Sequence, residues 1–312
     1  MKPSFGEFLG EELSSYFVLV TAAFIACTFL AVRWAKRARY DHEALIDLAL
    51  ISVFTGVGGA RIAHVLFDGF FWDYVHLCID PDQVGWKIPR SECLSEWVQG
   101  RWDEAASLCR PSARDCLAIF RFWQGGLTWY GGMIAGVGYG LYFFRKEGFP
   151  LGVGLDLAGL LLPVGLFFGR IGCFLSGCCF GKATDHPLGV SFPPWSPASE
   201  SQWREGLLGH PSLPSLPVWP TQLFEAGGSL LIAFVAWLVL HPRKTFHGQV
   251  FCLSMALYAL LRFGIETIRA DDRGIYGGLS TSQWISLFLL GVVVFVWREA
   301  SRRPELFSDP SW

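Results

Sequence analysis

The sequence has 312 residues, of which 52% are hydrophobic and 17% are charged, and its formal net charge at pH 7 is −2. Soluble domains average about 45–50% apolar and roughly 25% charged residues, so this composition disfavours a soluble protein with buried helices. The slightly negative charge also argues against a nucleic-acid partner, which needs a basic surface.

The N-terminal residues 1–13 are acidic and have no basic stretch before an apolar run, so we expect no secretory signal there. After them, seven stretches approach the ~20 mostly apolar residues with which an α-helix crosses a bilayer. The fourth of them is rich in Gly and Leu, and its helix could extend through residue 180. In chain order they are residues 16–32, 45–67, 126–144, 151–168, 221–240, 248–266 and 282–297. We therefore expect an all-α polytopic membrane protein of about seven transmembrane helices, forming a single transmembrane domain over residues 1–312.

Basic residues concentrate in alternate connectors between these stretches. They are Arg33, Lys36, Arg37, Arg39, Arg145, Lys146, Arg243, Lys244, Arg298, Arg302 and Arg303. Cytoplasmic loops carry the excess of Lys and Arg, so we expect the N-terminus outside and the C-terminus in the cytoplasm.

This orientation leaves two large extracytoplasmic loops. Residues 69–124 hold Cys78, Cys93, Cys109 and Cys116, and an even number of cysteines outside the cytoplasm predicts two disulfides with three possible pairings. A zinc site is less favoured in this loop, because the cysteines lack a C-x₂-C spacing. Residues 182–220 are rich in proline, which favours an irregular arm over helix.

Ionisable side chains within the spans are costly and therefore pair or line a functional cavity. Tyr258, Arg262, Glu266 and Arg269 follow at spacings of four, four and three, which places them on one helical face. Other such residues are Arg61, His64, Arg170 and Glu225. Guanidinium groups match phosphate with paired donors, so the arginines predict a cavity for a phosphate-bearing lipid that opens to the outer side. The alternative is an Arg–Glu network that only locks helices together.

Five blocks of sequence carry a resemblance to a known family. In order they are GGARIAHVLF, GGLTWYGGMIAG, GRIGCFLSGCCFGKATDHPLGVSFP, WPTQLFEA and YALLRFGIETIRADDRG. They resemble the motifs of prolipoprotein diacylglyceryl transferases, over nearly the whole chain except residues 69–124, which look like an insertion.

The resemblance implies a transferase of the bacterial cytoplasmic (inner) membrane. Such an enzyme moves the diacylglyceryl group of phosphatidylglycerol to the lipobox cysteine thiol in the signal peptide of a prolipoprotein. A thioether forms and glycerol phosphate is released, with no metal and no organic cofactor. The acceptor peptide would approach laterally from the bilayer.

The resemblance also assigns residues. Arg170 and Arg262 fall on the family's essential arginines, and we expect them to bind the lipid phosphate and stabilise the leaving group. Glu266 is expected to orient Arg262 and Arg269, or to act as a base. Further matching positions are Tyr258, Arg61, Gly177, Gly181, Gln222, Glu225 and Arg269. Glu225 has either a structural or a catalytic role.

Two departures from the family bear on the chemistry. Tyr130 stands where the family often has His, and His64 stands where it often has Tyr, so the two residues are expected to face one another with exchanged roles. The alternative for His64 is a packed side chain bonded to a carbonyl.

Cys173 and Cys178 replace Asn and Glu and form C-x₄-C-C with Cys179. These cysteines are expected to be small buried side chains, a disulfide pair, or a thiol that carries an intermediate. The replacements leave two other functions open: a divergent member with another thiol or small-molecule acceptor, and a non-catalytic phospholipid-binding membrane protein.

Overall fold

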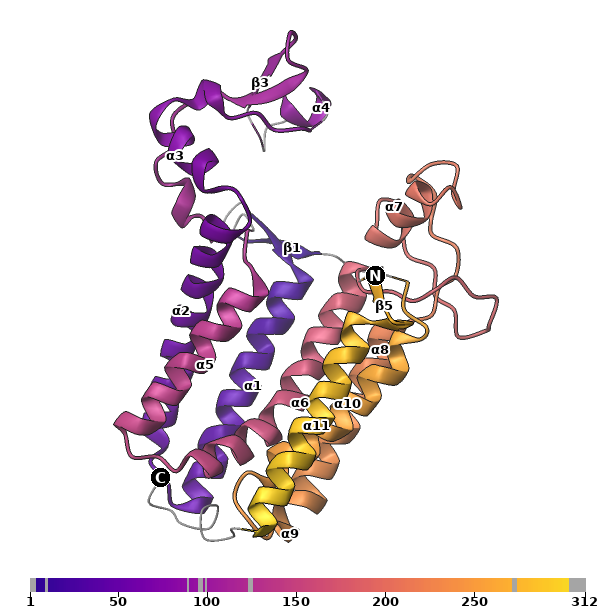
Figure 1. Cartoon of the computed structure of the whole chain (residues 1–312). Helices are drawn as coiled ribbons and strands as arrows, with labels where there is room; N and C mark the ends of the chain where they lie inside the picture. The colour runs from indigo at the N-terminus through magenta and orange to yellow at the C-terminus, as the bar shows by residue number, and fades with distance from the viewer. Residues whose placement is uncertain are drawn as a thin grey trace. The chain divides into compact units, whose positions relative to one another are not determined.

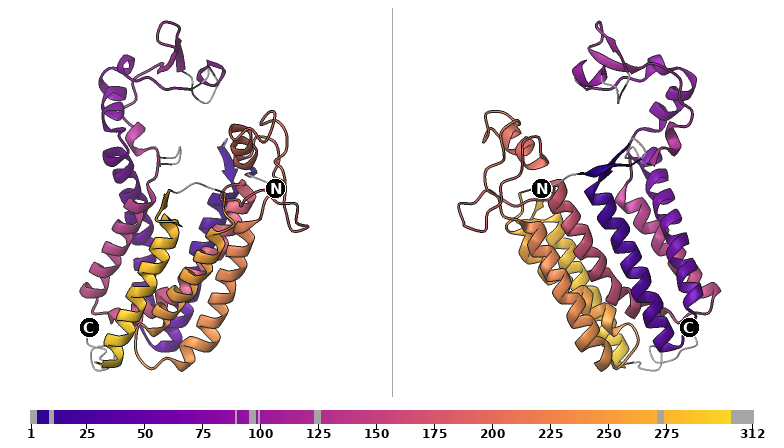
Figure 2. Two further views of the ribbon diagram at one scale, coloured as in Figure 1. Left: turned by 45° about the vertical axis from the view of Figure 1, so that its right-hand side comes forward. Right: turned by 180° about the vertical axis from the view of Figure 1, so that it is seen from behind.

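The computed structural model describes residues 4–8, 11–88, 90–94, 98, 100–122, 126–270 and 274–302. They fall into two compact units: residues 1–45 together with 147–312, and residues 46–146. Both are built mainly from helices (Figures 1 and 2).

The first unit is a bundle of long helices that run side by side (Figure 1). They are α1 (Ser15–Ala38), α6 (Leu151–Ser176), α8 (Thr221–Val235), α10 (Gln249–Glu266) and α11 (Thr281–Arg302). Helix α8 continues through the π-helical turn η4 (Ala236–Leu240) into α9 (His241–Arg243). Helix α6 contacts α1, α8 and α10, so residues on it reach most of the bundle.

Close approach of backbones sets the packing of α6 against α10. A Cβ atom at Gly159 would lie 2.6 Å from the Phe251 backbone, which only glycine permits. At the start of the same helix, fully buried Asp156 accepts hydrogen bonds from Lys244 Nζ at 2.8 Å and the Val250 N–H at 2.9 Å. These contacts fix the position of the first turn of α10 along α6.

Short strands and an arm complete this unit. The hairpins are β1 (Ser4–Phe8) with β2 (Glu11–Ser14), and β5 (Ile275–Tyr276) with β6 (Leu279–Ser280). The Pro-rich arm contains helix α7 (Pro197–Arg204), a short departure from the expected irregular chain. It starts where proline is tolerated at N1, and Ser196 caps it by accepting from the Ser199 N–H. The arm has its own small core of Phe192, Ala198 and Val218.

The second unit contains most of α2 (His42–Phe67), together with α5 (Trp129–Lys146). The two helices meet through glycines: a Cβ at Gly131 would lie 2.5 Å from Gly59 O and 2.3 Å from Ala63 Cβ. The loop between them carries α3 (Phe71–Ile79), η1 (Pro81–Gln83), α4 (Arg90–Cys93), β3 (Gly100–Asp103), β4 (Leu108–Pro111) and η2 (Ala118–Phe120). Of the three possible pairings, the structure forms Cys78–Cys116 and Cys93–Cys109.

Six helices in the described part of the chain are long and apolar enough to cross a membrane. They are Ser15–Ala38, His42–Phe67, Leu151–Ser176, Thr221–Arg243, Gln249–Glu266 and Thr281–Ala300. The remaining expected span is helical as α5 but is not among the six. Helix α6 ends at Ser176, short of residue 180, because Gly177 takes a left-handed φ of 74° and turns the chain. The chain is a polytopic helical membrane protein; the orientation remains a prediction, and Arg303 lies outside the described residues.

Candidate functional site

Glu225 on α8 is the fully buried carboxylate around which the first unit gathers its charged side chains. Its Oε1 lies 2.9 Å from Arg170 Nη2 of α6 and accepts a 2.9 Å hydrogen bond from the Tyr258 hydroxyl of α10. Its Oε2 lies 3.9 Å from Arg269 Nη1. Three helices and the segment after α10 are thereby joined through one side chain, and two guanidinium groups share one carboxylate.

A second ion pair lies one turn further along α10. Arg262 Nη2 is 2.6 Å from Glu266 Oε2 and donates to Ser282 Oγ at 3.3 Å. Glu266 Oε1 accepts from the Ser280 hydroxyl at 2.8 Å. The pairing of Glu266 with Arg262 agrees with the expected orienting contact, while Arg269 lies beside Glu225.

Gly181 ties the chain after α6 to two distant segments. Its N–H donates to Trp219 O at 2.9 Å, and its backbone forms an isolated antiparallel β-bridge with the backbone of Arg269. A Cβ at Gly181 would lie 2.7 Å from Ile268 O and 2.7 Å from the Trp219 Cβ. Only glycine fits between these segments, which positions Arg269 beside Glu225.

The turn between α6 and Gly181 is held by the first residues of α8. The Thr221 hydroxyl donates to Cys179 O at 2.7 Å, and Gln222 Nε2 donates to Cys178 O at 2.7 Å. Gln222 is buried, and its Oε1 has no hydrogen-bond partner among the described residues. Buried polar atoms are normally hydrogen-bonded, so Gln222 Oε1 is a buried acceptor that a ligand's donor could satisfy.

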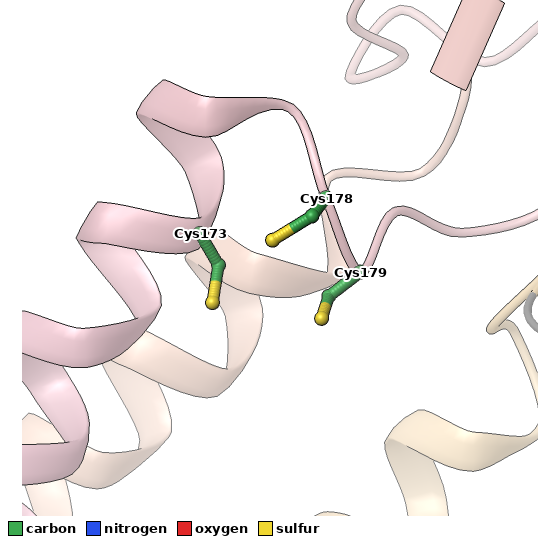
Figure 3. Close-up of side chains that lie close together, drawn as sticks. All are labelled: Cys173, Cys178 and Cys179. Atoms are coloured by element: carbon green, nitrogen blue, oxygen red, sulfur yellow. The ribbon is translucent and has the colours of Figure 1, made fainter. Parts of the chain in front are cut away.

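Three free thiols converge at this turn (Figure 3). Cys173 comes from the last turns of α6, and Cys178 and Cys179 follow its end; their sulfur atoms lie within 4.8 Å of one another. Cys179 has a φ of 62°, the left-handed region that non-glycine residues rarely adopt. Hydrogen bonds with the Cys173 and Cys178 thiols, and then the Arg269 guanidinium, lower the pKa of the Cys179 thiol despite burial.

The second unit positions Arg61 and His64 by different contacts. Arg61 donates to the Ile119, Gly126 and Ala118 carbonyls at 2.8, 3.1 and 2.6 Å, so it holds the chain between η2 and α5. His64 Nδ1 lies 2.9 Å from Asp68 Oδ2, the same oxygen that accepts from the Thr128 hydroxyl at 2.6 Å.

The carboxyl group of Asp68 makes His64 part of a dyad. Hydrogen bonds from Thr128 and His64 hold the pKa of Asp68 below its usual range. His64 is thus hydrogen-bonded to a carboxylate and not, as the alternative prediction had it, to a backbone carbonyl. Tyr130 is 60% exposed and stacks edge to face with Trp129. The exchange of roles between His64 and Tyr130 stays a prediction.

Sequence reasoning did not find Asp68, Thr128, Ser280 or Ser282. The i, i+4 spacing of His64 and Asp68 was a usable signal, since helical neighbours at that spacing touch. Ser280 of β6 and Ser282 at the start of α11 reach the Arg262–Glu266 pair from a distant part of the chain, which no local pattern indicates.

A family model described as prolipoprotein diacylglyceryl transferase matches residues 5–297. The chain belongs to the prolipoprotein diacylglyceryl transferase family. It is accordingly a transferase. The six long apolar helices in the described part of the chain agree with a membrane protein.

Curated relatives carry the name phosphatidylglycerol–prolipoprotein diacylglyceryl transferase. The one from Clostridium tetani (strain Massachusetts / E88) is 26% identical over 299 residues, 95% of this chain and 96% of the relative. The one from Bordetella avium (strain 197N) is 34% identical over 197 residues, 60% of this chain and 67% of the relative. The one from Xylella fastidiosa (strain M12) is 33% identical over 219 residues, 62% of this chain and 70% of the relative.

Proposed function

We propose that this chain transfers the diacylglyceryl group of phosphatidylglycerol to the lipobox cysteine thiol of a prolipoprotein in a bacterial inner membrane. The names of its relatives supply both substrates. The observation that carries the proposal is the buried cluster of Arg170 and Arg269 around Glu225. Two guanidinium groups held at one buried carboxylate offer the paired N–H donors that an anionic headgroup binds.

The arginines suit a phosphate that becomes a leaving group. Arg170 and Arg262 are the proposed phosphate ligands, because guanidinium groups cannot lose their proton and bind phosphate oxygens in pairs. Glu225 and Glu266 hold these side chains in place before substrate arrives. Preorganised charge of this kind stabilises the negative charge that builds up as the ester bond breaks.

The buried Gln222 Oε1, which has no hydrogen-bond partner among the described residues, supports binding of a glycerol headgroup. Phosphatidylglycerol carries hydroxyl groups beyond its phosphate, and a hydroxyl that donates to Gln222 Oε1 would satisfy this buried oxygen. Gly177 and Gly181 shape the turn that places Gln222 and Arg269 at the cluster.

The reaction forms a C–S bond and breaks a C–O bond. The acceptor thiolate attacks the glyceryl carbon that bears the phosphate ester, and glycerol phosphate leaves with the bonding electron pair. The thiol must first lose its proton, and His64, oriented by Asp68, is the proposed proton acceptor. We expect His64→Ala to lower the rate of transfer, and an unchanged rate would exclude this role.

The deciding experiment incubates purified protein with phosphatidylglycerol and a lipobox peptide and weighs the peptide by mass spectrometry. We expect a diacylglyceryl mass increase on the peptide cysteine that is lost in Arg170→Ala and Arg262→Ala. Arg204→Ala is the matched control, because Arg204 lies exposed on α7 with its side chain 73% accessible. Bound phosphatidylglycerol without peptide product would overturn the transfer and favour a phospholipid-binding protein. Product only with other thiols would point to a divergent acceptor.

A further inference from the structure

We propose that Cys173, Cys178 and Cys179 form a three-thiolate zinc site whose fourth position binds the acceptor thiol. This inference rests on the proposed transfer for the identity of the acceptor. The zinc site itself depends on the three thiols and their immediate surroundings and not on the transfer (Figure 3).

The spacing of the sulfur atoms suits one tetrahedral ion. Zn–S bonds of about 2.3 Å place the sulfurs of a tetrahedral site ~3.8 Å apart. The three sulfurs here already lie within 4.8 Å of one another, so a small contraction is enough. Soft thiolate ligands select zinc over magnesium or calcium.

The backbone is shaped to bring the three thiols together. Gly177 ends α6 in a left-handed turn. Two residues later, Cys179 has a φ of 62°, a left-handed conformation that usually requires glycine. Thr221 and Gln222 hold the carbonyls of Cys179 and Cys178 from α8. Strained backbone persists only where its surroundings fix it, and it concentrates at functional sites.

A zinc ion accounts for three cysteines better than a disulfide does. A disulfide pairs two thiols and leaves the third unused, whereas all three sulfur atoms lie within 4.8 Å of one another here. The structure forms disulfides at Cys78–Cys116 and Cys93–Cys109 and leaves these three cysteines free. The cluster is thus distinct from the disulfides of the loop.

Charge and exposure agree with a site of three protein ligands. Zinc with three thiolates carries one negative charge, which the Arg269 guanidinium, hydrogen-bonded to the Cys179 thiol, would favour. Cys173 is buried while Cys178 and Cys179 are partly exposed. A metal held between them therefore keeps one accessible side, as zinc sites with an open fourth position require.

The open position would activate the acceptor. The lipobox thiol binds zinc as a thiolate, because a coordinated thiol is deprotonated outright, and its proton goes to the proton acceptor of the proposed transfer. The sulfur would then attack the glyceryl carbon, and glycerol phosphate would leave with the electron pair of the broken C–O bond. No oxidant or reductant is needed.

The first test measures metal on the intact protein. The full chain, purified in detergent with a mild thiol reductant, is loaded with Zn²⁺, desalted and analysed by elemental mass spectrometry. We expect one zinc ion per chain, absent from the variant with Cys173→Ser, Cys178→Ser and Cys179→Ser. Cys252→Ser is the matched control, because Cys252 is also a buried free cysteine but packs against Met255 and Val293. Equal zinc in wild type and triple variant would overturn the site.

Cobalt gives a readout that needs no variant. Co²⁺ added to the wild-type protein should produce the near-ultraviolet absorption of thiolate-to-cobalt charge transfer, and its absence would overturn the site even if the triple variant fails to fold. A lipobox peptide with cysteine should shift this spectrum, and the same peptide with serine should not. No shift with the cysteine peptide would overturn the open fourth position.

These readouts separate the metal site from the proposed transfer. A cobalt spectrum that responds to the peptide, without any diacylglyceryl product, would contradict the transfer and support the site. Product formed by the triple variant at the wild-type rate would support the transfer and overturn thiol activation by zinc.

Discussion

Glu225 has no exposed surface, and a buried carboxylate is tolerated only when charges and hydrogen bonds compensate its lost hydration. Glu225→Ala would leave Arg170 and Arg269 without their shared carboxylate. Loss of one partner from a buried pair costs about 3–5 kcal/mol, so we expect a clear drop in the midpoint of thermal unfolding in detergent. Tyr258→Phe removes one hydrogen bond to a charged group and should cost about 1.5 kcal/mol.

Tryptophan fluorescence during heating measures both variants. Glu200→Ala is the control, because Glu200 pairs with Arg204 at 3.5 Å on the exposed face of α7. An unfolding midpoint for Glu225→Ala as high as that of Glu200→Ala would show that Glu225 does not hold the helices together.

Arg262 offers a test that separates charge from geometry. Arg262→Lys keeps the charge, but a lysine ammonium lacks the planar fork that binds phosphate oxygens in pairs and that Arg262 holds in place through Nη2 at Glu266 and Ser282. We expect kcat for transfer to fall by roughly 10²-fold, as when one preorganised donor is removed from a leaving group, with little change in the unfolding midpoint. Steady-state rates with phosphatidylglycerol and a lipobox peptide measure it.

The matched control for this change is Arg302→Lys. Arg302 also pairs with a glutamate on its own helix, Glu299 at 3.6 Å, but its side chain is 67% exposed. Exposed pairs contribute about 0–1 kcal/mol, so this variant should keep the wild-type rate. If Arg262→Lys also keeps it, the paired geometry of Arg262 is not part of catalysis.

The sequence predicted the site best where neighbours lie on one helix. The spacing of Arg262 and Glu266 predicted their contact, because residues four apart on a helix touch. The meeting of Arg170, Glu225 and Tyr258 needs three helices to pack in one arrangement. No spacing within one helix encodes that arrangement, so these contacts came only from the structure.

At the scale of whole elements, apolar runs predicted the existence of helices better than their ends. All seven expected stretches are helical over most of their length, and six of the helices are long and apolar enough to cross a membrane, where the backbone must satisfy its hydrogen bonds internally. The end of α6 depended on a single left-handed glycine, Gly177. Helix α5 is rich in Gly and Tyr and ends in Arg145 and Lys146, which explains its weaker apolar character.

The glycines of α5 predict how closely it packs on α2. A methyl group at Gly131 would lie 2.3 Å from Ala63 Cβ and 2.5 Å from Gly59 O, so Gly131→Ala must push the helices apart. Overpacking of this kind costs about 1–3 kcal/mol. We expect a lower unfolding midpoint, measured by heating in detergent.

Gly138 provides the control on the same helix. A Cβ at Gly138 has nothing within 4 Å, and alanine favours a helix over glycine by about 1 kcal/mol. Gly138→Ala should therefore leave the midpoint unchanged or raise it. Equal destabilisation by both substitutions would show that the close contact with Gly59 and Ala63 does not explain the effect of Gly131→Ala.

At the scale of the whole molecule, the membrane topology depends on whether α5 crosses the bilayer. With seven spans and an outside N-terminus, Arg37 and Arg145 lie in the cytoplasm and Ser212 lies outside. If α5 does not cross, Arg145 moves outside and Ser212 moves inside, while Arg37 stays. Single cysteines at these three positions therefore distinguish the two topologies, since all three side chains are exposed.

The background for this experiment replaces the free cysteines by serine, at Cys27, Cys173, Cys178, Cys179 and Cys252. The cysteines of Cys78–Cys116 and Cys93–Cys109 do not react, and both topologies place them on the oxidising side, where disulfides persist. A membrane-impermeant maleimide on cells with a permeabilised outer membrane should label Ser212→Cys, and should label Arg37→Cys and Arg145→Cys only after the inner membrane is disrupted. Labelling of Arg145→Cys in place of Ser212→Cys would show that α5 does not cross. The arm that follows the arginine and cysteine cluster would then face the cytoplasm, which contradicts the predicted extracytoplasmic arm.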